Sequence, residues 1–326
     1  MSATQANGLI VETRHLTKRY GRKAPAALDD LNLQVSEGAL YGFIGPNGAG
    51  KTTTLRMLAG LLEPSSGEIY VAGHSVRHEP RAVHHYVGYM PDFFGLYQEM
   101  TAWEYLDFFA RCHNLAPQRR LTVVDELLEL VGLADKRDAD VGHLSRGMQQ
   151  RLCLAHALVH DPAVLLLDEP ASGLDPRARV EMRELLRELS AMGKTIILSS
   201  HILSELAEMC SEVGIIERGR LVASGSLAAL RQRAQPGRVL RLHVLSDVQA
   251  AQSLLSGFDQ ITTVTRLNGG HAEDEAWLEA YLSADERYAA HVLAQMVQQG
   301  VAIAEYRQVG NELEELFLQL TAGDGV

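Results

Sequence analysis

Residues 45–52 of the chain read Gly45-Pro46-Asn47-Gly48-Ala49-Gly50-Lys51-Thr52. This stretch follows a short apolar segment, residues 40–44, and precedes residues 53–59, which read as a helix. Glycines let the backbone turn so that N–H groups point inward, and these donors bind phosphate oxygens together with a helix N-terminus. Lys51 would reach terminal phosphates, and the Thr52 hydroxyl would bind Mg²⁺. The strand–loop–helix context favours a phosphate-binding loop over a glycine-rich turn without a ligand.

Two carboxylates follow a second apolar segment. Residues 164–167 read Val-Leu-Leu-Leu and are followed by Asp168 and Glu169. A continuous apolar run bounded by polar residues is typical of a strand covered on both faces. Asp168 would lie beside Mg²⁺, and Glu169 would polarise an attacking water. Alone, the segment could be a strand that runs into an acidic loop, but the phosphate-binding loop earlier in the chain favours the catalytic interpretation.

Composition limits the class of protein. The chain has 326 residues, of which 46% are hydrophobic and 22% are charged, as in ordinary globular proteins with about two domains at this length. The net charge is −11, which argues against non-specific binding to nucleic acid or anionic lipid. The sequence contains no apolar run of the length that a membrane span needs and no signal-peptide pattern at its start. We therefore expect a cytosolic chain.

The sequence changes character near Gln235-Pro236-Gly237, so we expect a first domain of residues 1–235 and an accessory domain of residues 236–326. The second part reads as strand, helix, strand, strand, helix, strand, which is the ferredoxin-like order of a small α+β domain. Asn268-Gly269-Gly270 is a hairpin turn signal between its middle strands. Residues 312–320 read as a final amphipathic helix.

A third motif stands between the phosphate loop and the two carboxylates. Residues 144–148 read Leu-Ser-Arg-Gly-Met, which resembles the signature motif of ATP-binding-cassette (ABC) ATPases, usually Leu-Ser-Gly-Gly-Gln. Residues 171–175 resemble the D-loop of that family, and residues 199–201 resemble its switch-histidine segment. The likeness covers about residues 8–230. It implies an α/β fold, the P-loop NTPase of the ABC type, with a helical signature subdomain over about residues 93–150.

The resemblance implies a role for individual residues. ATP would bind to Gly45, Pro46, Asn47, Gly48, Ala49, Gly50, Lys51, Thr52 and Thr53. Tyr20 would stack on adenine, although it could also be a half-buried aromatic at a strand end. Ser145 and Gly147 would face the γ-phosphate held by an opposite subunit, with Asp175 of the D-loop nearby. Glu169 and His201 would be catalytic, and Thr52 and Asp168 would hold Mg²⁺.

The chain departs from the family at three positions. Asp92 stands where the family usually has a glutamine that contacts Mg²⁺ and water. A carboxylate is a hard oxygen ligand, so Asp92 is a third candidate for Mg²⁺ and the nucleotide site, although it could instead face solvent and cap its loop. In the signature motif, Arg146 replaces a glycine and Met148 replaces a glutamine.

Within the family, the best likeness is to ATP-binding subunits of two-component exporters of the ABC-2 type. Residues 89–97 and 311–317 carry this likeness. It implies a homodimer that powers a separate transmembrane permease for export, from the cytoplasmic face of the membrane. The aromatic cluster of residues 103–109 reads as core, or as a groove for that permease. Two alternatives stay open: a soluble ABC ATPase that acts on nucleic acid or ribosomes, and a regulatory module that binds nucleotide without hydrolysis.

Overall fold

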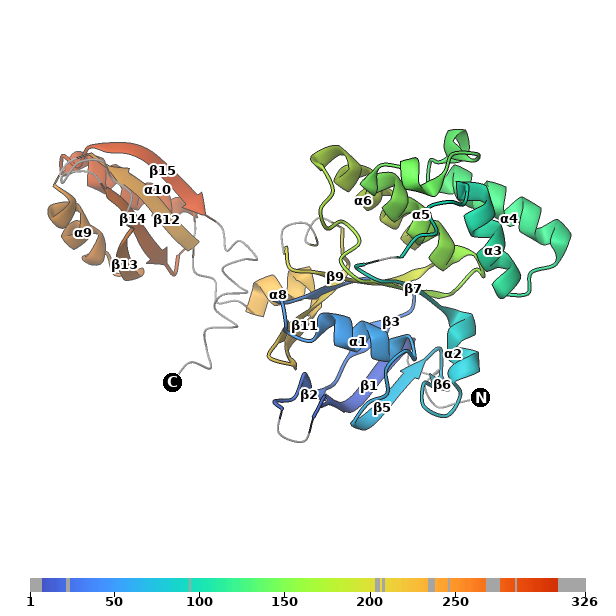
Figure 1. Cartoon of the computed structure of the whole chain (residues 1–326). Coiled ribbons are helices and arrows are strands. Elements are labelled where there is room, and N and C mark those ends of the chain that lie inside the picture. The colour runs from blue at the N-terminus through green and yellow to red at the C-terminus, as the bar shows by residue number, and fades with distance from the viewer. Residues whose placement is uncertain are drawn as a thin grey trace. The chain divides into compact units, whose positions relative to one another are not determined.

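The computed structural model describes residues 8–21, 24–93, 95–202, 206, 209–233, 238–245, 247–267, 276–284 and 286–309. The chain divides into two compact units, residues 1–227 and 228–326 (Figure 1). The domain boundary predicted between residues 235 and 236 lies outside the described residues, as do the turn 268–270, the helix 312–320 and the segment 311–317.

A six-stranded sheet forms the centre of the first unit, in the order β11-β10-β4-β9-β8-β7. Its strands are β4 (Leu40–Ile44), β7 (Val87–Met90), β8 (Val164–Leu167), β9 (Thr195–Ser200), β10 (Glu212–Glu217) and β11 (Arg220–Ser226). Strands β10, β4, β9, β8 and β7 are parallel, and only β11 runs against its neighbour. Because the carboxyl ends of parallel strands meet at one edge, the loops after β4, β7, β8 and β9 share that edge.

The predicted apolar strands are confirmed, and their burial explains their sequences. Every residue of β4, β8 and β9 is buried, as the continuous apolar runs in these segments indicate. The smaller antiparallel sheet consists of β1 (Leu9–Lys18), β2 (Leu28–Leu31), β3 (Gln34–Ser36), β5 (Ser66–Val71) and β6 (His74–Ser75). One apolar core joins both sheets to α1 (Lys51–Leu58), with members such as Val11, Phe43, Leu55 and Leu166.

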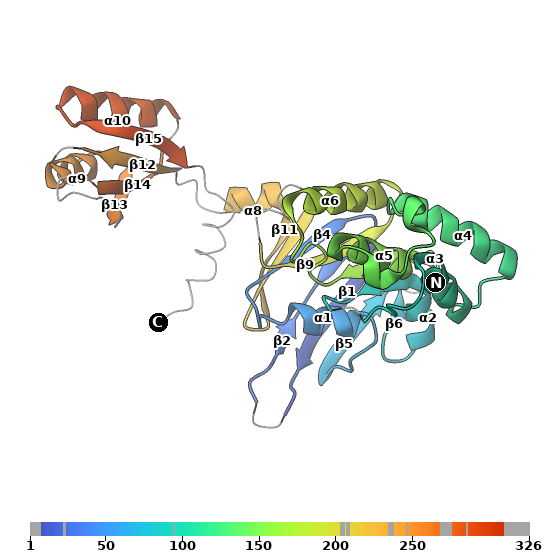
Figure 2. The same ribbon diagram turned by 45° about the horizontal axis from the view of Figure 1, so that its top comes forward.

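The described part of the first unit also contains helices besides α1 (Figure 2). They are α2 (Pro80–Tyr86), α3 (Ala102–Cys112), α4 (Pro117–Leu130), α5 (Arg146–Leu158) and α6 (Pro176–Ala191), with 3₁₀ turns at Ala134–Lys136 and Val141–His143. Helix α3 begins at a capping box, in which Thr101 and Glu104 satisfy each other's backbone N–H groups. Ser145 caps α5 and Asp175 caps α6. The segment that resembles the signature motif thus contains the N-cap of α5, and the segment that resembles the D-loop contains the N-cap of α6.

The second unit has the predicted ferredoxin-like order. After α8 (Leu227–Arg233) come β12 (Arg238–Val244), α9 (Val248–Ser256), β13 (Ile261–Leu267), β14 (Ala276–Leu282), α10 (Glu286–Gln298) and β15 (Ile303–Val309). The strands pair in the order β13-β14-β12-β15, and all neighbours are antiparallel. Leu240 and Leu242 of the sheet share one buried core with Leu255 of α9 and Val292 of α10. The unit therefore has a core of its own.

Among the described residues, none of the helices has the length and apolar character needed to cross a membrane.

Three histidines lie together where α3 and α5 end. The rings of His113 and His160 stack with centroids 4.1 Å apart, and the ring of His156 stacks on Phe109 at 3.6 Å. Burial lowers the pKa of His156 and of His160 to about 4. Both imidazoles are therefore neutral at pH 7.

This arrangement makes the stability of the first unit depend on pH. Because the two imidazoles have a lowered pKa in the folded protein, the unfolded chain binds more protons between pH 6.5 and about 4. The free energy of unfolding should fall as the pH falls through this range and become constant below it. We expect His156→Gln to remove up to about 3 kcal/mol of this dependence, measured by urea unfolding at several pH values. His78→Gln, at an exposed position, is the control, and equal pH dependence in all three proteins would contradict the assignment.

Candidate active site

The phosphate-binding loop joins β4 to α1 and depends on glycine at two points. Gly50, which precedes the first residue of α1, has a φ of 110°. A Cβ atom there would lie 2.5 Å from a methyl group of Leu28, and one at Gly45 would lie 2.3 Å from the carbonyl oxygen of Ile216. L-residues rarely adopt that φ, and neither position has room for a side chain. The loop is thus packed against neighbouring segments at both of its ends, whereas Pro46, Asn47 and Gly48 between them are exposed.

Lys51 lies folded back under this loop. Its Nζ donates to the carbonyl oxygens of Gly45 at 2.6 Å and Pro46 at 3.3 Å. The same atom lies 3.5 Å from Oε1 of Glu169, and both side chains are largely buried. A buried ammonium group needs such partners, because the loss of its hydration costs several kcal/mol. Lys51 therefore links the phosphate loop to the carboxylate that follows β8.

Ser199 connects the carboxylate of Asp168 with the backbone of Glu169. Its hydroxyl donates to Oδ1 of Asp168 at 2.7 Å and accepts the backbone N–H of Glu169 at 2.9 Å. Glu169 has a φ of 50°, which is uncommon for a residue with a side chain. The bond from its N–H to Ser199 stabilises this backbone conformation. The other oxygen of Asp168, Oδ2, is buried and has no hydrogen-bond partner among the described residues.

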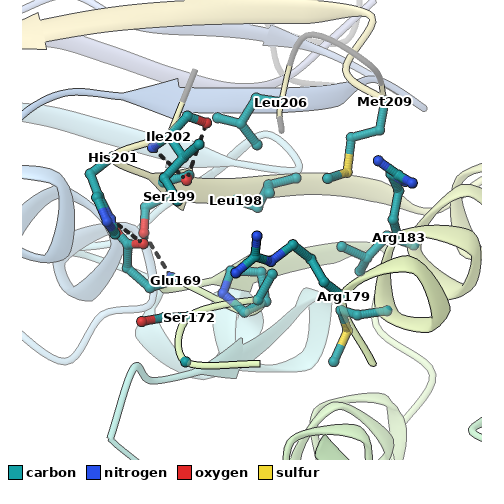
Figure 3. A pocket seen from close by; sticks show the side chains of 16 residues that line it. Glu169, Ser172, Arg179, Arg183, Leu198, Ser199, His201, Ile202, Leu206 and Met209 are labelled. Carbon is teal, nitrogen blue, oxygen red and sulfur yellow. Dashed lines mark hydrogen bonds and ion pairs between the residues drawn. The ribbon is translucent and has the colours of Figure 1, made fainter. Parts of the chain in front are cut away.

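His201 completes the group. Its Nδ1 lies 3.0 Å from Oε2 of Glu169, so the Glu169 carboxylate lies between His201 and Lys51. Figure 3 shows the two side chains meeting at one end of a cavity of about 140 Å³. Residues 170–173, α6 and the end of β9 form its other walls. A carboxylate held between an imidazole and an ammonium group is fixed in place, and it can accept a proton from a water molecule and become a neutral carboxyl group.

Tyr20, Asp92 and Asp175 make no hydrogen bond or ion pair with this group among the described residues. The Tyr20 ring is 63% exposed, and its hydroxyl lies 3.3 Å from Oγ1 of Thr53 in α1. Asp92 follows β7 and is exposed. Its charge contributes to the raised pKa of Tyr89, for which burial is the main cause. Asp175 accepts the backbone N–H of Ala178 at 2.8 Å.

The signature motif packs on α6. The Ser145 hydroxyl accepts the N–H of Met148 at 3.4 Å, and a Cβ atom at Gly147 would lie 3.1 Å from Ala178. Within the described part of the chain, no hydrogen bond or ion pair joins Ser145 or Gly147 to the phosphate loop. The structure thus brings Lys51, Asp168, Glu169 and His201 together and leaves the signature residues apart from them.

Ser199 is a site residue that sequence reasoning missed. The sequence marks it only as a neighbour of His201. The signal was the register of two adjacent parallel strands: Leu167 of β8 pairs with Leu198 of β9, so the residues that follow, Asp168 and Ser199, lie side by side.

Comparison with known proteins gives consistent matches. The family model described as ABC transporter matches residues 28–172. The Nod factor export ATP-binding protein I of Burkholderia orbicola (strain AU 1054) is 42% identical over 255 residues, which are 78% of this chain and 83% of that protein. The daunorubicin resistance ATP-binding protein DrrA3 of Streptomyces coeruleorubidus is 35% identical over 308 residues, 94% of either chain.

Solved structures match about two thirds of the chain. The structure of an ATP binding subunit of an ABC transporter is 32% identical with a TM-score of 0.62, over 69% of this chain and 92% of that one. The dimeric structure of a post-hydrolysis state of the ATP-binding cassette MJ0796, bound to ADP and Pi, is 25% identical with a TM-score of 0.61. It covers 67% of this chain and 98% of that one.

The Ser199 bridge predicts a difference between two adjacent serines. Ser199→Ala leaves the buried Asp168 carboxylate without its donor, so we expect a loss of about 1–3 kcal/mol in the free energy of unfolding, measured with urea. Ser200→Ala is the matched control, because the Ser200 hydroxyl accepts a single backbone N–H, that of Ile202, and lies outside the carboxylate pair. An equal loss in both variants would show that the bridge does not stabilise the fold.

Proposed function

The chain belongs to the family of ABC transporter ATP-binding proteins, and from this premise we propose that it hydrolyses ATP with Mg²⁺ to power export through a separate membrane permease. Family membership confirms the predicted P-loop fold of the ABC type and the predicted ATPase activity. Two relatives are named for Nod factor export and daunorubicin resistance, which supports export. The observation that carries the proposal is the contact of Glu169 with both Lys51 and His201.

ATP would bind along the start of α1. The backbone N–H groups of the glycine-rich loop and the Lys51 ammonium would donate to its phosphate oxygens. Lys51 is held at the loop by two carbonyl oxygens, so its charge is in place before the nucleotide arrives. The hydroxyl of Tyr20 contacts Thr53 of α1, and the exposed Tyr20 ring would stack on the base.

Hydrolysis would use Glu169 as the general base. As a water attacks the γ-phosphorus, its proton passes to the Glu169 carboxylate, and the bond from phosphorus to the ADP oxygen breaks. His201, 3.0 Å from the carboxylate, would orient Glu169 and hold the water beside it. The Ser199 bond to the Glu169 N–H fixes the backbone from which this carboxylate projects.

The donor set fits Mg²⁺. The ligands would be the Thr52 hydroxyl and the Asp168 carboxylate, with Asp92 as a further oxygen donor. Asp168 uses one oxygen to accept from Ser199, whereas its buried Oδ2 has no hydrogen-bond partner among the described residues. Oxygen donors of this kind are the ligands that Mg²⁺ prefers. The ion would neutralise the charge of the phosphates when bound.

We propose that the complete site needs two copies of the chain. Ser145 and Gly147 lie apart from the phosphate loop of their own chain, so the signature motif of a second subunit would contact the γ-phosphate, with Asp175 beside it. The Ser145 side chain bonds only weakly within its own helix, at 3.4 Å, and Ser145 is exposed. The relative of known structure in the post-hydrolysis state is a dimer, which supports this arrangement.

The permease would dock on an aromatic patch beside Asp92. Tyr105 of the predicted aromatic cluster is buried, but Phe108 is 38% exposed and stacks edge-on with Tyr97 at 5.7 Å. Phe93, next to Asp92, is 89% exposed. We give the name docking patch to Tyr97 and Phe108, which are in contact, together with Phe93, which precedes Tyr97 in the same loop. Exposed aromatics at one place favour an interface, and this contact would hold the chain at the cytoplasmic face of the membrane.

The general base can be tested by a change of one functional group. Glu169→Gln keeps the size of the side chain and removes its ability to take a proton, so we expect turnover of ATP to fall at least about 100-fold. ATP binding should remain, and ATP should hold the variant as a dimer in size-exclusion chromatography. Lys51→Ala should instead lose affinity for ATP. Glu184→Gln, exposed on α6, is the control. A Glu169→Gln protein that turns over ATP at the rate of the parent would exclude this assignment.

The docking patch can be tested on membranes. We expect the chain to bind inside-out vesicles from its native cells and not vesicles made from the extracted lipids alone. Phe93→Ser with Phe108→Ser should weaken binding to the native vesicles by about tenfold or more, because each buried aromatic contributes about 1.5–3 kcal/mol. Leu121→Ser, at an apolar position on α4 whose exposure of 54% lies between those of Phe93 and Phe108, should bind as the parent does. Equal binding to lipid-only vesicles would argue against a protein partner.

A further inference from the structure

Arg146, one of the two residues of the signature motif that depart from the family pattern, contacts the D-loop of its own chain. Its guanidinium group donates to the carbonyl oxygen of Ser172 at 3.3 Å. The same group lies against Gly173, where an added Cβ atom would be 2.5 Å from Cζ of Arg146. Gly173 has a φ of 69°, so both its backbone and its surroundings favour glycine. The guanidinium group of Arg146 thus occupies the space that a side chain at position 173 would need.

A second donor from the same helix reaches the same carbonyl group. Gln150, one turn further along α5 and buried, donates from Nε2 to the oxygen of Ser172 at 3.1 Å. The N–H of Ser172 in turn donates to the carbonyl oxygen of Glu169 at 3.0 Å. Three hydrogen bonds therefore connect the start of α5 with the backbone of the general base. Ser172 and Gly173 also line the cavity beside Glu169 and His201 (Figure 3).

We propose that Arg146 is a positioning residue that holds the D-loop, and through it Glu169, in register with the signature helix of the same chain. The proposal rests on the sandwich dimer proposed above. In that dimer, Ser145 contacts the ATP bound to one subunit, while Glu169 acts on the ATP bound to the other. Arg146 and Gln150 bond to Ser172 and so connect these two regions of one chain. Hydrolysis of the ATP bound to this subunit then depends on how its signature motif contacts the ATP bound to the other subunit.

The side chain needed for this task is an arginine. Glycine, the usual residue at this position of the family, has no donor that could reach Ser172. Lysine carries the same charge but lacks the planar guanidinium group that lies against Gly173 while it donates to the carbonyl. The partners of Arg146 in the structure are a carbonyl oxygen and a glycine, so its contribution is geometric and does not require a phosphate nearby.

The test is a double-mutant cycle on ATP hydrolysis. We expect Arg146→Gly to lower kcat about tenfold, the effect of one lost charge-assisted hydrogen bond, while KM for ATP and the unfolding midpoint stay unchanged. Gly173→Ala should lower kcat to a similar extent in the parent, because the new methyl group displaces the guanidinium. In the Arg146→Gly background the same change should cost about threefold or less, since the methyl group then has room. Arg177→Ala, 91% exposed at the start of α6, is the control and should keep full activity.

Two results would overturn the proposal. An unchanged kcat in Arg146→Gly would show that the contact does not position Glu169. The second result is a KM for ATP that is raised in Arg146→Gly and equal to that of the parent in Arg146→Lys. It would show that Arg146 acts by its charge and binds phosphate across the dimer. ATP-dependent dimerisation of Glu169→Gln, with and without Arg146→Gly, keeps the two proposals apart. If the single variant forms no dimer, the sandwich fails; if both variants dimerise alike while kcat falls with Arg146→Gly, the positioning role stands.

Discussion

The buried charge of Lys51 is the constraint on which the rest of the site depends. An ammonium group at this depth must be compensated, and it has two loop carbonyl oxygens and the Glu169 carboxylate for this purpose. The loop must therefore turn tightly over the lysine, which requires glycine at positions 45 and 50. Glu169 must also lie next to the loop, which requires β8 to lie near β4 in the sheet. In the observed order a single strand, β9, separates them. Ser199 lies near the end of β9 and His201 directly follows it, and both contact the residues after β8.

The same order links parts of the chain that are far apart in sequence. Ser199 bonds to the carboxylate of Asp168 and to the backbone N–H of Glu169. Ser172 bonds to the backbone of Glu169 and accepts from Arg146 and Gln150 of α5. The phosphate loop, Glu169 and helix α5 are thus connected within one chain by hydrogen bonds and by the ion pair of Lys51 with Glu169. The signature serine itself lies outside that set, and this is the physical reason to propose a second subunit. The second unit folds around a separate apolar core and contributes none of the described site residues.

Much of this architecture could be predicted from the sequence, because the relevant signals are local. The phosphate loop, the buried strand before Asp168 and the ferredoxin-like order all follow from short runs of residue types. Ser199 and the partner of Arg146 could not be found in this way, because they depend on the register of β8 against β9 and on the packing of α5 against the D-loop. The exposure of Phe108 could not be predicted either, because helical spacing identifies an apolar face but not the segment that covers it. Tyr105, on the same helix and part of the same cluster, is buried.

The central claim is that one chain holds the phosphate loop and the general base but borrows the signature motif. The most direct test is the specific ATPase activity of the purified chain, measured over a wide range of protein concentrations at saturating ATP and Mg²⁺. The account predicts that activity per mole of chain rises with concentration and becomes constant where sedimentation shows that dimers predominate. A specific activity that stays constant down to concentrations at which only monomers sediment would contradict it.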